Sequence, residues 1–164
     1  MISRKEKGME LFMQGYNCSQ AVVLAFADVI GVDQDQAARL SASFGGGLAR
    51  LRHVCGTVSG MSMVAGMLTA SSDPKDTQKK KENYEMVQRL AGEFEKRNGS
   101  IICRELLGLG TERTSVGKEY REGAAPEPRT KEYYDKRPCK ELVGEACEIL
   151  EDFLFSQVDK EIDF

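Results

Sequence analysis

Cysteine is the residue type in this chain best suited to chemistry, and it occurs five times in 164 residues. Four cysteines stand where the sequence predicts that a helix begins: Cys18, Cys55, Cys103 and Cys139. At a helix start, unpaired backbone N–H groups and the helix dipole favour a thiolate, which lowers the pKa of a free thiol from about 8.5 toward neutrality. Thiolates attack disulfides and peroxides or bind metals, so these four residues are candidate catalytic residues and candidate metal ligands.

Basic residues precede or follow three of these cysteines in the sequence. They are Arg50, Arg52 and His53 before Cys55, Arg104 after Cys103, and Lys136, Arg137 and Lys140 around Cys139. Positive charge near a cysteine further favours its thiolate. His53 is the sole histidine, and a surface or loop position is expected for it rather than a role as proton donor or ligand.

Cys147 differs from the other four cysteines. It is predicted to lie in the middle of a helix, on an apolar face between Glu145 and Glu148, where burial and negative charge both disfavour a thiolate. It also follows Cys139 by eight residues on the same helix, about 12 Å along the axis, which is too far for a disulfide. Cys147 is therefore predicted to be a core residue.

Glycines surround Cys55 in the sequence. Gly56 and Gly60 follow it, and residues 45–47 form a run of three glycines. Glycine lets backbone N–H groups converge on a thiolate, a bound anion or cluster sulfurs, so Gly56 and Gly60 are candidate cofactor-binding residues. The alternative is that Gly56 and Gly60 allow close helix packing while residues 45–47 form a turn.

The elements that position these residues are predicted to be helices, because apolar residues recur at helical spacing and no alternating strand pattern persists. The expected helices cover residues 4–15, 17–31, 33–44, 55–70, 76–97, 101–107 and 138 onward. Residues 108–137 contain several glycines and prolines and few periodic apolar residues, so one long irregular loop is expected there, as a lid or as a surface excursion. The prediction is an all-α fold, with residues 1–164 forming a single compact bundle of about five to seven helices.

Composition argues against two classes of partner. The chain has 23 Lys and Arg against 26 Asp and Glu, a net charge of -3, which provides no uniform basic field for nucleic acid or for an anionic membrane. The uncharged stretch 54–70 is shorter than the ~20 apolar residues of a membrane span and is predicted to be a core helix. No signal-peptide pattern opens the sequence, so a cytoplasmic location is expected, where cysteines are more often catalytic, redox-sensing or metal-binding than structural.

Several short strings resemble the C_GCAxxG_C_C family of redox-active bacterial and archaeal proteins. They are residues 17–22 (NCSQAV), 45–47 (GGG), 55–60 (CGTVSG) and 103–108 (CRELLG), together with Cys139 before Leu142 and Val143. Thr57 stands where the motif in the family's name has alanine. The resemblance implies a helical fold and singles out the four helix-start cysteines, with Cys147 additional; it supplies no substrate.

The leading hypothesis is a redox-active protein, an oxidoreductase or electron carrier, in which the four cysteines converge. Because they begin four different helices, a bundle can bring at least three sulfurs within about 8 Å of one another. They would then cycle between dithiol and disulfide or bind an iron–sulfur cluster, which usually has four thiolate ligands. An electron-transfer partner is implied but not identified, and a homodimer is compatible with the sequence.

Two further hypotheses remain open at this point. One is a structural zinc site, although the absence of a Cys-x-x-Cys pair argues against it and also against a thioredoxin-like mechanism. The other is a helical interaction module whose cysteines only pack.

Overall fold

The computed structural model describes residues 1–109 and 123–156. Among these residues there are nine α-helices and one 3-10 helix, and the only β-type pairing is an isolated antiparallel bridge between Val54 and Ile102. Six of the α-helices have seven or more residues. The predicted all-α fold is confirmed.

The helices follow the chain in the order of their labels. They are α1 (Arg4–Met13), α2 (Cys18–Ala25), α3 (Ala27–Ile30), α4 (Gln34–Ser41), η1 (Ala42–Phe44, the 3-10 helix), α5 (Gly56–Thr69), α6 (Thr77–Asn98), α7 (Cys103–Leu106), α9 (Lys131–Lys136) and α10 (Cys139–Phe155).

The caps expected from the sequence set where two of these helices begin. The Asn17 side chain accepts from the backbone N–H of Gln20, and the Gln20 side chain accepts from that of Asn17, which completes a capping box at the start of α2. At α4 only half of the expected box is present, in which Asp33 accepts from the backbone N–H of Gln36.

Two predicted elements need correction. The helix expected over residues 17–31 breaks at Phe26, whose backbone leaves the helical region (φ -117°, ψ 9°) while its ring is completely buried. The loop expected over 108–137 contains α9, which begins where Thr130 accepts from the backbone N–H of Tyr133. Residues 110–122 of that predicted loop lie outside the described residues.

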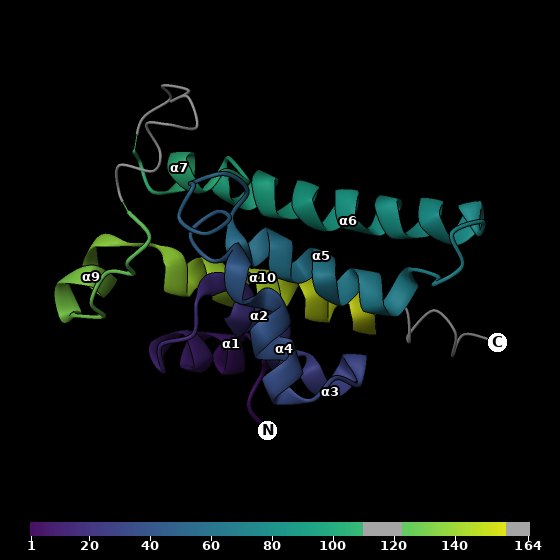
Figure 1. Cartoon of the computed structure of the whole chain (residues 1–164), viewed down its shortest axis with the longest axis horizontal. Helices are drawn as coiled ribbons and strands as arrows, with labels where there is room; N and C mark the ends of the chain where they lie inside the picture. The colour runs from purple at the N-terminus through teal and green to yellow at the C-terminus, as the bar shows by residue number, and fades with distance from the viewer. Residues whose placement is uncertain (110–122, 157–164) are drawn as a thin grey trace.

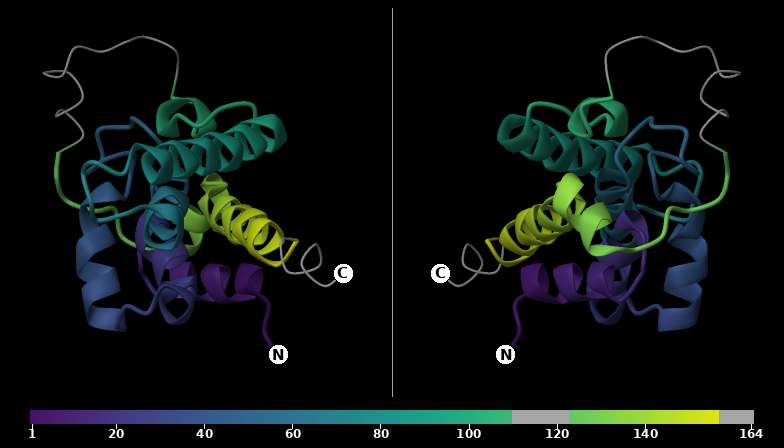
Figure 2. Two further views of the ribbon diagram at one scale, coloured as in Figure 1. Left: turned by 90° about the vertical axis from the view of Figure 1, so that its right-hand side faces the viewer. Right: turned by 90° about the vertical axis from the view of Figure 1, so that its left-hand side faces the viewer.

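The helices pack in layers (Figures 1 and 2). Helix α6 covers one side, α5 and α10 lie in the middle, and α1 to α4 lie on the opposite side. Helix α10 contacts α1, α2, α5 and α6, and α2 contacts α1, α4 and α5. In Figure 1, α5, α7 and α10 begin toward the same end of the bundle, so three of the cysteine-bearing helix starts are grouped by the topology itself.

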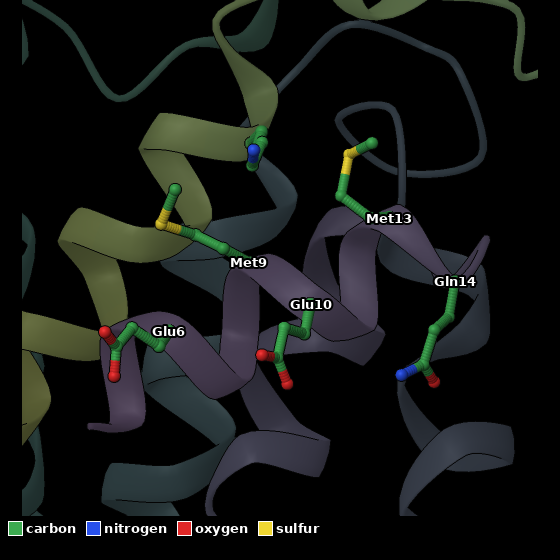
Figure 3. Close-up of a pocket in the computed structure, with 6 residues that line it drawn as sticks. Glu6, Met9, Glu10, Met13 and Gln14 are labelled. Carbon is green, nitrogen blue, oxygen red and sulfur yellow. The ribbon is translucent and has the colours of Figure 1, made fainter. Parts of the chain in front are cut away.

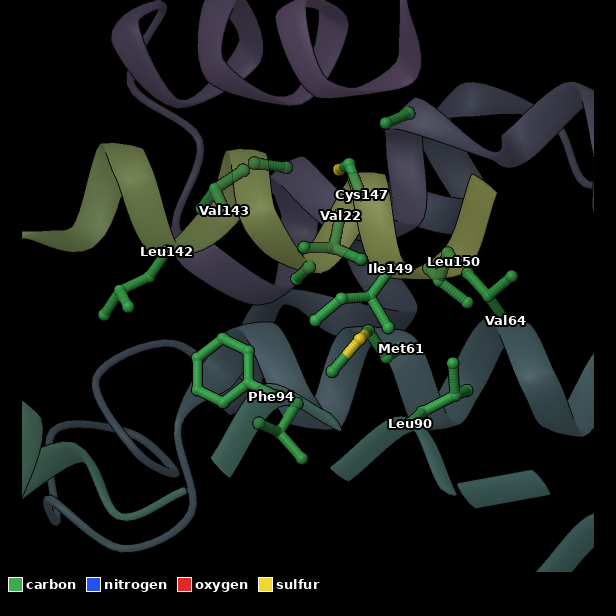
Figure 4. Close-up of a cluster of buried hydrophobic side chains, with 14 of the residues drawn as sticks. Val22, Met61, Val64, Leu90, Phe94, Leu142, Val143, Cys147, Ile149 and Leu150 are labelled. Carbon is green, nitrogen blue, oxygen red and sulfur yellow. The ribbon is translucent and has the colours of Figure 1, made fainter. Parts of the chain in front are cut away.

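The hydrophobic core lies between α2, α5, α6 and α10 (Figure 4). Met61, Phe94 and Ile149 are almost completely buried there, and Cys147 is buried beside Val143. The predicted core position of Cys147 is confirmed. The uncharged stretch 54–70 forms α5 within this core, and none of the described helices is long and apolar enough to cross a membrane.

Candidate functional site

The four predicted helix starts are confirmed. Cys18, Cys103 and Cys139 are the first residues of α2, α7 and α10, and Cys55 is the N-cap of α5. The structure therefore gives all four cysteines the same local setting, although their surroundings differ.

Cys55 and Cys103 are held side by side by the isolated backbone bridge. The backbone N–H of Cys55 donates to the carbonyl of Ile101 at 2.8 Å, and that of Cys103 donates to the carbonyl of His53 at 2.6 Å. Each cysteine thus begins its helix directly after a backbone pairing, which fixes the start of α7 against the start of α5. His53 lies in this pairing and is exposed, as its predicted loop position requires.

The segment before Cys55 has a left-handed backbone. Gly46 and Gly47 have φ angles of 67° and 69°, and positive φ continues in non-glycine residues, namely Leu48, Ala49, Arg50 and Arg52. Each such residue costs roughly 1–2 kcal/mol, and strain of this kind concentrates at functional sites. A Cβ on Gly47 would lie 2.7 Å from the Cβ of Cys103, so this turn also needs glycine for close approach.

Gly56 and Gly60 bring α2 close to α5. A Cβ on Gly56 would lie 3.1 Å from the Cβ of Cys18, and one on Gly60 would lie 2.9 Å from the Cβ of Val22. The packing role that the sequence offered as an alternative is confirmed, and it brings Cys18 to the start of α5. A role of these glycines in binding a cofactor stays a prediction.

The four helix-start cysteines gather at one locus. Every pair among Cys18, Cys55, Cys103 and Cys139 interacts electrostatically, and the thiols of Cys18 and Cys139 form a hydrogen bond. Cys147 instead interacts with Glu151 and with cations of α1, and burial raises its pKa to about 12. The structure thus brings the four predicted site cysteines together and leaves the fifth apart; the separation of about 8 Å stays a prediction.

The hydrogen-bonded pair is chemically asymmetric. The hydrogen bond from Cys18 lowers the pKa of Cys139 below the ordinary 9.0, and the guanidinium groups of Arg137, Arg52 and Arg129 lower it further, against the effect of burial. The same hydrogen bond, together with burial, raises the pKa of Cys18 well above 9.0. Cys139 is therefore the more acidic thiol of the pair, and Cys18 is the hydrogen-bond donor to its thiolate.

The expectation that every helix start lowers a cysteine pKa is wrong for Cys55 and Cys103. Burial raises the pKa of Cys55 to about 11, although the Thr57 hydroxyl lies 3.0 Å from its Sγ and opposes the rise. Burial also raises the pKa of Cys103, against a hydrogen bond of 3.8 Å from Arg52. Both residues are less than 8 % exposed, and at that depth loss of hydration outweighs the helix dipole.

Arg52 and Thr57 take roles that sequence spacing did not predict. Arg52 was expected to act on Cys55, three residues away, but its side chain points to Cys103, 51 residues away. Thr57 was noted only as a departure from the family's motif, yet it is completely buried and its hydroxyl contacts Cys55.

A cavity of about 310 Å³ lies near the starts of α2 and α10, although neither Cys18 nor Cys139 is among the described residues that line it. Asn17, next to Cys18, lines it, and so do four arginines: Arg50, Arg52, Arg129 and Arg137. Three of these arginines, Arg52, Arg129 and Arg137, also lower the pKa of Cys139, so that sulfur lies within electrostatic reach of the cavity's cations. Three of the four arginines were noted in the sequence because they lie near a cysteine, but Arg129 is ten residues from the nearest one and was missed.

Backbone carbonyls and an aromatic ring hold the cavity's arginines in place. Arg129 donates to the carbonyls of Phe12 (3.2 Å) and Tyr16 (3.1 Å). The Tyr133 ring lies 5.0 Å from the Arg129 guanidinium and 4.8 Å from that of Arg137, within cation–π range of both.

One carboxylate lies among these cations. Glu127 accepts from Arg137 at 2.7 Å and pairs with Arg50 at 3.6 Å, and it is more exposed than either arginine. Arg50 also donates to the carbonyls of Gly123 and Ala125. The cavity thus already holds a carboxylate between two guanidinium groups.

A second hollow, of about 450 Å³, lies along α1 beside α10 (Figure 3). Met9 points toward α10 in this view, whereas Glu10 and Gln14 point the other way. Lys140 is the one cation among the described residues that line it, whereas four arginines line the other cavity.

The predicted metal or cluster site has no ready-made ligand set among the described side chains. Over residues 1–109 and 123–156, no group of three or more His, Cys, Asp or Glu side chains is arranged to hold a metal ion. A role of the four cysteines as metal or cluster ligands stays a prediction.

The comparisons with known proteins agree with the resemblance noted from the sequence. A family model described as "Putative redox-active protein (C_GCAxxG_C_C)" matches residues 16–153, a span that includes all five cysteines. No curated protein and no solved structure matches the chain.

Proposed function

The chain belongs to the C_GCAxxG_C_C family of redox-active proteins, and on that premise we propose that Cys18 and Cys139 form a dithiol–disulfide couple. The observation that carries the proposal is the hydrogen bond between their thiols. Two thiols in hydrogen-bond contact need only a small movement to reach the S–S bond length of about 2.05 Å.

The electrostatics support a division of roles within the pair. Because its pKa is lowered, Cys139 is the thiolate that attacks a disulfide RS–SR, forming a mixed disulfide with R and releasing RS⁻. Cys18 then gives its proton to the first RS⁻ and attacks the Cys139 sulfur, which releases the second RS⁻; water protonates this second thiolate. The protein gains one disulfide, the substrate is reduced to two thiols, and the balance needs no further oxidant.

Cys55 and Cys103 have a supporting role in this proposal. Their raised pKa values keep them protonated at neutral pH, so neither competes with Cys139 as a nucleophile. Each still contributes packing and polarity next to the reacting pair, since both interact with Cys139.

The test is a redox titration with peptide mapping. The protein is equilibrated with mixtures of oxidised and reduced dithiothreitol, the remaining thiols are blocked, and disulfide-linked peptides are identified by mass spectrometry. Wild-type protein and the control variant Cys147→Ala should form one disulfide, between Cys18 and Cys139. Cys18→Ser and Cys139→Ser should form none, and a dominant disulfide between any other pair would overturn the proposal.

A metal-centred function is the second candidate, because the four cysteines do gather at one locus. Among the described residues no three potential ligands are arranged to hold a metal ion, so the dithiol couple is the better supported of the two candidates. Metal and sulfide analysis with a visible spectrum, on protein prepared without oxygen, separates the two candidates. Stoichiometric iron and sulfide, or zinc, would favour the metal-centred function over the dithiol couple.

A further inference from the structure

We propose that the arginine-lined cavity is the substrate site, and that it selects small disulfides carrying carboxylate groups. The inference rests on the proposed dithiol couple, to which it adds a substrate class. Three features of the cavity support it: its charge, its size, and the effect of its arginines on Cys139.

The charge of the cavity is opposite to that of the whole chain. The chain carries a net charge of -3, yet four guanidinium groups and one carboxylate are among the described residues that line this cavity. Guanidinium groups bind carboxylates through two parallel hydrogen bonds, which makes arginine the residue of choice for such recognition.

Arg129 contributes charge that no described carboxylate offsets. Its partners among the described residues are two backbone carbonyls and aromatic rings, all of them neutral. These partners fix the guanidinium while leaving its positive charge directed at the cavity. A group held in this way costs little entropy when an anion binds to it.

Glu127 shows what kind of group the cavity accepts. Its carboxylate lies between Arg137 and Arg50, and about half of that side chain is exposed. A carboxylate on a ligand can therefore take the place of Glu127 while the arginines keep their positions. The cavity's volume of about 310 Å³ is at the small end of ligand sites, which suits a small molecule rather than a macromolecular partner.

The position of the cavity connects binding to reaction. Arg137 lines the cavity two residues before Cys139 in the sequence, and both Arg137 and Arg129 lower the pKa of that thiol, so a carboxylate bound to these arginines lies within electrostatic reach of the Cys139 sulfur. Arg52, donating to Cys103, adds a third cation on the same side. A disulfide bond a few atoms from the carboxylate would then lie within reach of Cys139.

Three disulfides of similar length provide the first test: dithiodipropionate (anionic), hydroxyethyl disulfide (neutral) and cystamine (cationic). We expect the exchange rate at Cys139 to fall in that order, with the anion about tenfold faster than the neutral compound, the factor that one charge-assisted hydrogen bond provides. Arg137→Gln should reduce this ratio toward one. The ratio is the informative quantity, because a changed pKa of Cys139 affects all three rates together.

Two further variants keep the test decisive if Arg137→Gln folds poorly. Glu127→Gln removes the competing carboxylate and should increase the preference for the anion. Arg89→Gln, in an exposed residue of α6, makes the same change of charge away from the cavity and should leave the ratio as in wild type. Equal ratios in wild type, Arg137→Gln and Glu127→Gln would overturn the inference.

A non-reacting ligand separates this inference from the proposed function. Suberate has the chain length of dithiodipropionate but no sulfur, so its binding to reduced wild-type protein, followed by NMR, reports on the cavity alone, with octanediol as the neutral control. If suberate does not bind while the Cys18–Cys139 disulfide still forms, the cavity assignment fails and the dithiol couple stands. If suberate binds but no disulfide forms with any reagent, the dithiol couple fails, and the substrate assignment with it.

Discussion

The rate at which each cysteine is alkylated tests the asymmetry of the thiol cluster. At pH 7 a thiol of pKa about 11, as in Cys55, is roughly one part in ten thousand thiolate, and one of pKa about 12, as in Cys147, roughly one part in a hundred thousand. Cys139, with a pKa below 9.0, exceeds about one part in a hundred.

Thiolate fraction alone overstates the difference in rate, because a more basic thiolate is a better nucleophile. With a Brønsted coefficient of about 0.45, two pKa units reduce a hundredfold advantage by about eightfold, and three units reduce a thousandfold advantage by about twentyfold. Cys139 should therefore react at least about tenfold faster than Cys55 and at least about fortyfold faster than Cys147. Access favours the same order only slightly, since Cys139 is 9 % exposed and Cys55 4 %.

The assay is brief labelling of reduced protein with iodoacetamide, whose neutrality avoids any bias from the arginines. Lys140 separates Cys139 and Cys147 into different tryptic peptides, so their rates are measured independently. In denaturant all sites should react alike, which calibrates the reagent. Cys18→Ala, which removes the hydrogen-bond donor, should slow labelling of Cys139. Equal rates at Cys139 and Cys55 in the folded protein would refute the argument from burial and hydrogen bonding.

Three further predictions concern stability. In α5, Gly60→Ala should destabilise the protein by about 1–3 kcal/mol, because the new Cβ would meet α2. Gly66→Ala has open space around its Cβ and should be neutral or slightly stabilising. Denaturant midpoints compare the two variants, and equal effects would contradict the packing argument. Arg4 lowers the pKa of Asp28 to about 2, so this pair contributes stability above pH 4 that is lost as the pH falls toward 2. Solvent screening limits this contribution to about 1 kcal/mol. In acid unfolding, Asp28→Asn should not show this pH-dependent loss of stability. Cys147→Ala should lower the free energy of unfolding by about 1 kcal/mol at neutral pH and leave the redox couple unchanged. Because the pKa of Cys147 is raised in the folded protein, wild type should lose stability as the pH rises from 9 to 12. If the stability of Cys147→Ala falls equally over that pH range, Cys147 is not the source of the loss.

Helix starts and the buried position of Cys147 could be predicted from the sequence because their causes are local. The capping box of Asn17 and Gln20 lies within four residues, and the apolar stripe around Cys147 lies within one helix. The break at Phe26 could not be predicted in this way, since it depends on where a buried ring packs.

The electrostatics of the site escaped prediction because they depend on contacts between distant segments. Arg129 reaches the carbonyl of Phe12 across 117 residues of sequence, and Arg52 reaches Cys103 across 51. The sign of the pKa shift at Cys55 depends on how deeply the α5 start is buried, which helical spacing does not encode. The four cysteines could therefore be found from the sequence, but the difference in pKa between Cys139 and Cys55 could not.

The two carbonyls that anchor Arg129 give this residue a second part in the molecule. Helix α1 has no basic residue in its last turn. The Arg129 guanidinium donates to the Phe12 carbonyl and so supplies positive charge at the negative end of the α1 dipole. The same cation acts on the Cys139 thiol. Because couplings between sites are reciprocal, a change in the charge of Cys139 must alter how strongly Arg129 holds the end of α1, so the state of one sulfur is transmitted to the end of a helix more than a hundred residues away in the sequence.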